Sequence, residues 1–155
     1  MYSKELIVNI LVYIDNNINS KISIDELSLK FSYNKFYIMK LFKKELSISI
    51  IDYINVIKIY NSLESIKENY SFLTTALKNG YYSLEYYSEM FKKVTGVNPT
   101  TYKKIINHDN NISDLEFDLC MNNLASIKEI INKCNNYKYN LKPTTLKVKR
   151  LTIFK

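Results

Sequence analysis

The residues best suited to chemistry in this chain are the lysines and aromatic side chains between Asn34 and Lys44, NKFYIMKLFKK. At helical spacing, one face of this segment is apolar and suited to a core: Ile38, Leu41 and Phe42. The other face sets two apolar side chains among lysines: Phe36, Met39, Lys40 and Lys43. Exposed apolar groups beside lysines are unfavourable unless a partner covers them, and DNA offers both base edges and phosphates. The alternative is that Phe36 and Met39 pack on a neighbouring helix.

Residues for other chemistry are scarce. With two glycines and one histidine in 155 residues, the sequence has no phosphate-cradling loop and no obvious general base. Cys120 and Cys134 would lie roughly 21 Å apart on one helix, too far to form a disulfide. The sequence has no Cys-x-x-Cys pair, so we expect reduced thiols and neither a redox motif nor a zinc site. These observations predict a protein that is not an enzyme and needs no cofactor or metal.

The charge balance favours a polyanionic partner. The chain has 22 Lys and Arg against 15 Asp and Glu, a net charge of +7, which suits DNA, RNA or an acidic surface. An AT-biased genome, which favours Lys, Asn, Ile and Tyr codons, would explain the same balance. The start of the chain is amphipathic, and no stretch resembles a signal peptide or a membrane span. We therefore expect a cytoplasmic protein that does not enter a membrane.

The elements that would position the basic face are helices. Because glycine and proline are rare, long helices joined by short polar turns are expected, which makes the fold all-α. Ser23 with Glu26 has the form of a capping box, and Asn34, Ser83 and Asn98 are suited to helix N-caps. The predicted elements are helices over 4–18, 23–31, 34–45, 48–68, 72–79, 83–94, 99–106 and 115–134, a polar linker over 135–142 and a short strand over 146–154.

The basic segment occurs twice. A shift of 49 residues places Asn34 on Ser83 and Phe42-Lys43-Lys44 on Phe91-Lys92-Lys93. The repeat predicts two helix-turn-helix units, a first over about 4–47 and a second over about 69–106. The helix over 48–68 would join them, and its length of roughly 30 Å is close to the ~34 Å of one DNA turn. Helices 34–45 and 83–94 would then reach successive major grooves.

The motifs of the second unit resemble those of the AraC/XylS family of bacterial transcription regulators. They are Gly80-Tyr81, Tyr86-Tyr87-Ser88, Phe91-Lys92-Lys93, Gly96-Val97-Asn98-Pro99 and Tyr102-Lys103. Ile24-Asp25-Glu26-Leu27, Phe42 to Leu46 and Tyr53-Ile54 match the first unit, so the resemblance covers about 4–106. It implies two homeodomain-like helix-turn-helix subdomains on a linker helix, with double-stranded DNA as the partner.

The resemblance also implies roles for individual residues. Those implied to face bases are Phe36, Met39, Lys40, Leu84, Glu85, Ser88 and Glu89. Those implied to lie near phosphates are Asn34, Lys35, Tyr37, Lys43, Lys44, Ser83, Lys92 and Lys93.

Three departures from the family pattern stand out. Lys58 and Thr74 replace an Arg and a Glu that commonly pair, and Ser47 replaces a glycine. Glu89 stands where a basic residue is common, one turn after Glu85. Because carboxylates are repelled by phosphates, we expect the first unit to supply most base recognition. The alternative is a module that binds another regulator or RNA polymerase in place of half its site.

The remaining segment, 107–155, has no assigned role in the sequence. Its helix and strand suit a linker into an effector domain. Alternatively, residues 113–134 would form a homodimer contact through an apolar seam: Leu115, Leu119, Ile127 and Ile131.

Overall fold

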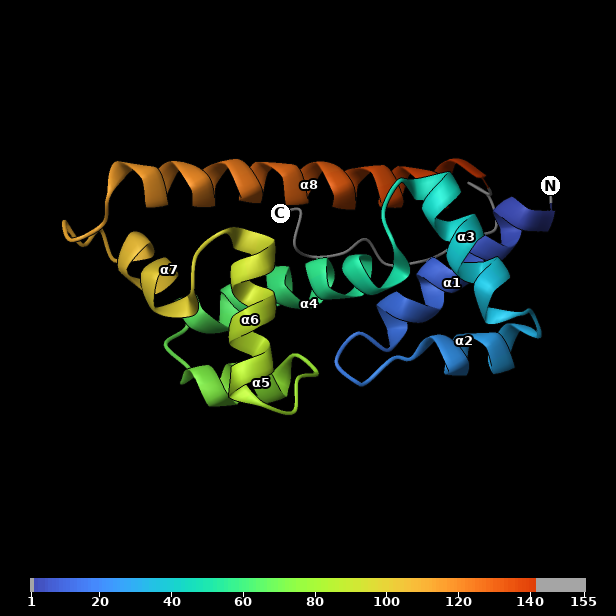
Figure 1. The fold of residues 1–155 in the computed structure, drawn as a ribbon, viewed down its shortest axis with the longest axis horizontal. Helices are drawn as coiled ribbons and strands as arrows, with labels where there is room; N and C mark the ends of the chain where they lie inside the picture. The colour runs from blue at the N-terminus through green and yellow to red at the C-terminus, as the bar shows by residue number, and fades with distance from the viewer. Residues whose placement is uncertain (1, 142–155) are drawn as a thin grey trace.

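The computed structural model describes residues 2–141, which form eight helices (Figure 1). They are α1 (Tyr2–Asn16), α2 (Ile24–Phe31), α3 (Lys35–Leu46), α4 (Ile50–Lys67), α5 (Phe72–Lys78), α6 (Leu84–Thr95), α7 (Pro99–Ile106) and α8 (Asp114–Leu141). No strand occurs within residues 2–141, in agreement with the all-α prediction. The strand predicted over 146–154 lies outside the described residues.

The predicted N-caps are confirmed. The side chains of Ser23, Ser83 and Asn98 accept hydrogen bonds from the backbone N–H three residues later, and Asn34 accepts one from Phe36. These bonds satisfy N–H groups that a helix start leaves unpaired. The Glu26 carboxylate accepts a hydrogen bond from the Tyr13 hydroxyl, so the residue expected to complete a capping box also links α2 to α1.

Within residues 2–141, six helix ends use left-handed backbone, among them the ends of α3, α5 and α6. Gly80 follows α5 with φ of 82°, and Gly96 ends α6 with φ of 87°. Ser47 ends α3 with φ of 61°, in a region where a side chain is strained and glycine is not. The family's usual glycine would suit the position of Ser47 better.

Helix α4 is shared by two hydrophobic cores. Tyr53 and Ile57 belong to the core formed with α1, α2 and α3, whereas Ile59 and Ile66 belong to the core formed with α5, α6 and α7. Ten residues of α4 are buried, around most of its circumference. A helix that is buried on all sides needs neighbours on all sides, and this explains how one helix joins the two units.

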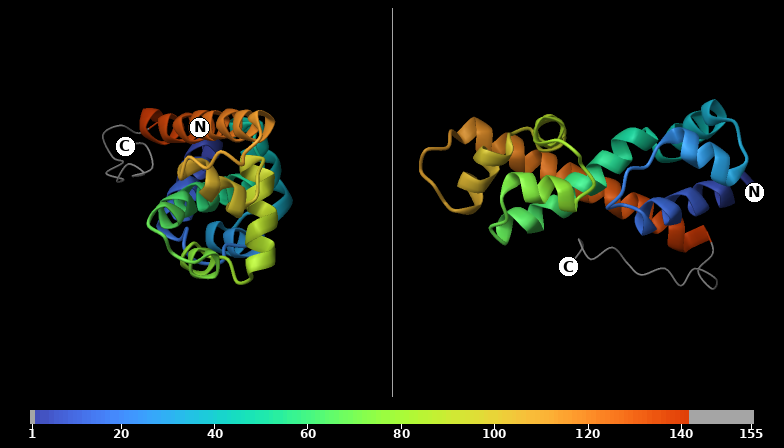
Figure 2. Two further views of the ribbon diagram at one scale, coloured as in Figure 1. Left: turned by 90° about the vertical axis from the view of Figure 1, so that its left-hand side faces the viewer. Right: turned by 90° about the horizontal axis from the view of Figure 1, so that it is seen from below.

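Helix α8 lies along both units (Figure 1). It packs on α1 and on the C-terminal end of α6, and it adds Ile127, Ile131 and Cys134 to the first core and Cys120 to the second. In the left panel of Figure 2, α8 runs across the top of the view and covers one side of the helix-turn-helix units. The helix therefore braces the two units against each other.

Two expectations for this segment were wrong. The predicted polar linker over 135–142 is helical as far as Leu141, because Asn135 and Lys138 are buried and Lys138 pairs with the buried carboxylate of Asp15. The four residues of the predicted dimer seam do not form one exposed surface, because Ile127 and Ile131 are buried within the chain's own first core. Leu115 and Leu119 are exposed.

Candidate nucleic-acid interface

The outward side of α3, here the α3 face, consists of Phe36, Met39 and Lys40. Phe36 is 67% exposed and Met39 is 42% exposed, so the alternative in which they pack on a neighbouring helix is wrong. Both line an apolar hollow that they share with Ile24 of α2 and Ile51 of α4. On the other side of α3, Ile38, Leu41 and Phe42 are buried as predicted.

Lysines surround the α3 face. Lys40, Lys43 and Lys44 are exposed, and no ion pair holds them within residues 2–141. Lys35 is 3.4 Å from the carboxylate of Asp25 in an exposed pair, which is worth about 0–1 kcal/mol and is readily exchanged for a phosphate. The Tyr37 ring stacks on Tyr33 with centroids 5.6 Å apart. The side chain of Asn34 serves as the N-cap of α3.

The outward side of α6, here the α6 face, consists of Leu84, Glu85, Ser88 and Glu89. Glu85 and Glu89 are exposed, and Ser88 is half-buried. Tyr87 and Phe91 on the inward side are fully buried, and the Tyr87 hydroxyl donates a hydrogen bond to Ser62 Oγ at 2.8 Å. The α6 face is therefore acidic where the α3 face is basic.

Basic residues lie at the far end of α6. Lys92 is exposed, and Lys93 donates to Asp52 Oδ1 of α4 at 3.2 Å in an exposed pair. The hydroxyl of Ser83 accepts a hydrogen bond from the backbone N–H of Tyr86, as the N-cap of α6. The predicted phosphate-side residues of the second unit therefore lie at the two ends of the helix, with the carboxylates between them.

The two helices lie on the same side of the molecule. In Figure 1 α3 and α6 face the viewer and both rise toward α8, and in the right panel of Figure 2 both lie along the upper edge. The 18 residues of α4 span about 27 Å between the units. Helix α8 contacts the C-terminal end of α3, where Lys133 Nζ of α8 donates to the Leu46 carbonyl at 3.3 Å.

Lys58 forms a connection between the units that sequence reasoning missed. It is 4% exposed, and its ammonium donates to the carbonyls of Ser20 at 2.6 Å and of Gly80 at 3.2 Å. Thr74, by contrast, is exposed and bonds to Ser71 at the start of α5, so the two positions do not pair. Burial lowers the pKa of Lys58 to about 8. A sequence feature that could have indicated this role is the position of Lys58 between Ile57 and Ile59, in an apolar part of the linker helix.

Metal-binding clusters, exposed thiols and membrane-spanning helices are not found within residues 2–141. Residues 2–141 contain no cluster of three His, Cys, Asp or Glu side chains that could hold a metal ion. Cys120 and Cys134 are free and buried, and burial raises the pKa of Cys134 to about 12, so its thiol stays protonated. Over the same range, no helix is long and apolar enough to span a bilayer.

A family model described as a helix-turn-helix domain, of the AraC type, matches residues 27–105. The chain belongs to the AraC/XylS family of DNA-binding transcription regulators. The match includes α3 and α6, the helices predicted to contact bases, and α4, the helix predicted to set the distance between them. It excludes α8.

Relatives and solved structures agree with this membership. The HTH-type transcriptional activator AarP of Providencia stuartii is 24% identical over 103 residues, which cover 66% of this chain and 76% of AarP. The transcriptional regulatory protein HptR of Staphylococcus aureus is 27% identical over 103 residues, 66% of this chain but only 41% of HptR. The C-terminal domain of AraT, a response regulator from Geobacillus stearothermophilus, shares the fold with a TM-score of 0.60 at 24% identity over 70% of this chain and 88% of that domain.

Proposed function

We propose that this AraC/XylS-family protein binds specific DNA sequences, with α3 and α6 entering successive major grooves of one duplex. The observation that carries the proposal is the α3 face, where Phe36, Met39 and Lys40 are exposed and surrounded by lysines. Lys40 has the donor needed for guanine O6 and N7, and Phe36 and Met39 suit the methyl group of thymine. The surrounding lysines would neutralise phosphates and set the register.

The two units are proposed to contribute unequally. Glu85 and Glu89 are exposed on the α6 face, where they can accept a hydrogen bond from cytosine N4 but are otherwise repelled by phosphates. Lys92 and Lys93 lie in the last turn of α6, and in this proposal they contact phosphates. In this proposal, the first unit selects the sequence and the second unit docks mainly on the backbone.

The test is selection of binding sites from a random duplex library by the full chain, followed by fluorescence anisotropy. We expect enrichment of one motif. Affinity for the enriched site should exceed that for a scrambled duplex by about 10³-fold or more at physiological salt. A plot of log K against log salt should have a slope of about −0.9 for each phosphate contacted. Equal affinity for the enriched and scrambled duplexes would contradict sequence-specific reading.

A second candidate function follows from the acidic α6 face. Glu85 and Glu89 would suit a basic surface on another regulator or on RNA polymerase, with the protein serving as an adaptor that binds DNA weakly. The two functions differ in what the α6 carboxylates do. If Glu85→Ala and Glu89→Ala leave the affinity for DNA unchanged but abolish co-elution with purified RNA polymerase, the adaptor function is favoured.

A further inference from the structure

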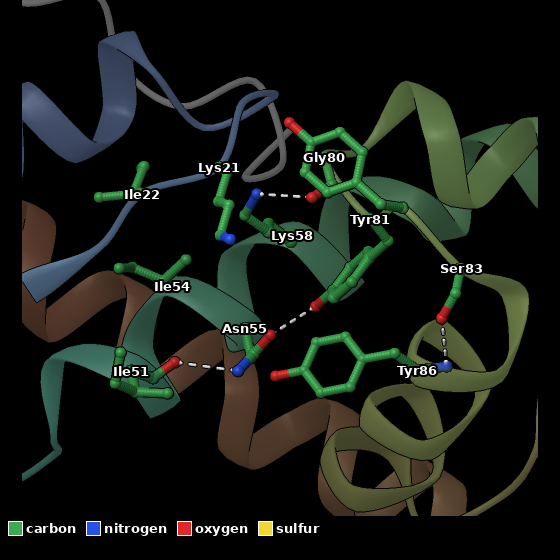
Figure 3. Close-up of a pocket in the computed structure, with 11 residues that line it drawn as sticks. Lys21, Ile22, Ile51, Ile54, Asn55, Lys58, Gly80, Tyr81, Ser83 and Tyr86 are labelled. Atoms are coloured by element: carbon green, nitrogen blue, oxygen red, sulfur yellow. Dashed lines mark hydrogen bonds between the residues drawn. The ribbon is translucent and has the colours of Figure 1, made fainter.

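A cavity of about 430 Å³ lies between the two helix-turn-helix units (Figure 3). Its walls come from the loop before α2, from α4, from the segment between α5 and α6 and from the first turn of α6. The apolar part is formed by Ile22, Ile51 and Ile54 and by the ring of Tyr86. Cavities of this size and apolar character hold small organic molecules, and they commonly occur between domains.

The charged part of the wall is entirely positive. Two lysines line the cavity, Lys21 from the first unit and Lys58 from α4, and none of the eleven lining residues is an Asp or a Glu. In Figure 3 the Lys21 side chain points into the cavity on the side where Lys58 lies. Within residues 2–141 no carboxylate pairs with either lysine. A buried cation without a counter-ion is unfavourable, so an anion bound here would be stabilised.

The hydrogen bonds of Lys58 leave room for such an anion. An ammonium has three donors, and Lys58 uses two of them on the carbonyls of Ser20 and Gly80. Asn55 is already engaged, since it accepts from the Tyr81 hydroxyl at 2.7 Å and donates to the Ile51 carbonyl at 3.2 Å. The third donor of Lys58 and the ammonium of Lys21 are therefore the cationic donors that remain to bind a ligand's charged end.

We propose that this cavity is a binding site for a small aromatic carboxylate. Its carboxylate would accept hydrogen bonds from Lys58 and Lys21, and its aromatic body would pack among Ile22, Ile51, Ile54 and Tyr86. Such a ligand would touch both units and the helix that joins them. The site adjoins the two faces, since Ile51 also lines the hollow beneath the α3 face and Ser83 caps α6. Its occupancy can nevertheless be measured without DNA.

The test is isothermal titration of the full chain with biphenyl-4-carboxylate, using biphenyl-4-carboxamide as the uncharged analogue of the same shape. We expect saturable one-to-one binding of the carboxylate with Kd below about 1 mM, and binding of the carboxamide roughly tenfold weaker or more. Lys58→Met should remove this preference for the charged analogue. Lys128→Met, an exposed lysine of α8, should leave it unchanged.

A second measurement avoids any loss of folding in Lys58→Met. In the unaltered chain, with isoleucine methyl groups labelled for NMR, the carboxylate should shift the signals of Ile22, Ile51 and Ile54 and spare Ile127 and Ile131 in the core beneath α8. The proposal is overturned by no saturable binding up to about 5 mM. It is equally overturned by equal affinity for the two analogues, or by methyl shifts elsewhere in the chain. None of these results depends on whether the chain binds DNA.

Discussion

The two helix-turn-helix units have the same architecture and opposite outward chemistry. Helices α3 and α6 each have 12 residues, a side-chain N-cap and a left-handed residue at the end. Their inward residues are large and buried in both units. Their outward residues differ: the α3 face sets Phe36, Met39 and Lys40 among lysines, whereas the α6 face carries Glu85 and Glu89. Packing restricts what can change inside each unit, and the outward positions are free to diverge.

Attachment of α8 also differs between the units. At the first unit, Lys138 forms a buried ion pair with Asp15 of α1. At the second, α8 lies against Gly96, where an added Cβ would be 2.7 Å from both Asn123 Nδ2 and Leu119 Cγ. The contact of α8 with the first unit depends on an ion pair, and its contact with the second unit depends on the missing side chain of Gly96. Substitutions can therefore loosen α8 from one unit at a time.

The largest effect is expected at the ion pair. Lys138→Met would leave the Asp15 carboxylate buried without its partner, and breaking a buried pair this way costs about 3–5 kcal/mol in the free energy of unfolding. The carboxylate already lacks a hydrogen bond at Oδ1. Urea denaturation followed by circular dichroism measures the loss.

Two variants control this prediction. Asp15→Leu with Lys138→Met should recover most of the stability, because an apolar pair removes the stranded charge. Lys128→Met, on the exposed side of the same helix, should stay within about 0.5 kcal/mol of the unaltered chain. A loss below about 1 kcal/mol in Lys138→Met would show that the pair does not hold α8 to the first unit.

Gly96→Ala tests the attachment at the second unit. The methyl group would meet Leu119 and Asn123 of α8, and the positive φ of 87° adds strain. We expect a loss of about 2 kcal/mol, of which roughly half is backbone strain. The control is Asn98→Gly, which replaces the N-cap of α7 in the loop after α6 without placing atoms against α8 and should cost only about 0.3 kcal/mol. Equal losses in the two variants would argue against close packing at Gly96.

Local signals predicted much of the fold, and distant contacts account for the failures. The caps at Asn34 and Ser83 and the inward positions of α3 and α6 depend on residues within one or two turns, so the sequence pattern was sufficient. Lys138 was predicted to lie in a polar linker because its partner, Asp15, is 123 positions away. The role of Lys58 was missed for the same reason, since its acceptors are Ser20 and Gly80. The residues proposed to contact DNA stay predictions, although the exposed positions of Phe36 and Met39 suit them.

The two faces are distinguished by DNA affinity. Lys40→Ala should weaken binding to the selected site roughly tenfold, about 1.4 kcal/mol, because it would remove the base contact proposed for the first unit. Lys43→Ala should weaken binding to all sequences and reduce the salt slope by about 1, as expected for a phosphate contact. Glu89→Ala should cause no loss, because it removes a carboxylate that DNA repels. Fluorescence anisotropy at several salt concentrations measures all three.

The opposite pattern would reverse the assignment of the units. If Lys40→Ala and Lys43→Ala leave the affinity intact while Glu85→Ala abolishes binding, the second unit reads the sequence and the first is the docking unit. Lys128→Ala on α8 is the control for loss of positive charge alone.

The smallest change in the free energy of unfolding is expected at Ser47, the residue after the C-terminal end of α3. Ser47→Gly would give α3 the same residue that ends α6, and it relieves the strain of φ at 61°. Two effects oppose the gain: glycine increases the freedom of the unfolded chain, and Lys133 Nζ loses a weak contact to Ser47 Oγ at 3.4 Å. Lys133 keeps its bond to the Leu46 carbonyl, where a cation also favours the helix C-terminus. A net gain of about 0.5 kcal/mol by urea denaturation is therefore expected. A loss would mean that the Lys133 contact with the serine hydroxyl outweighs the backbone strain.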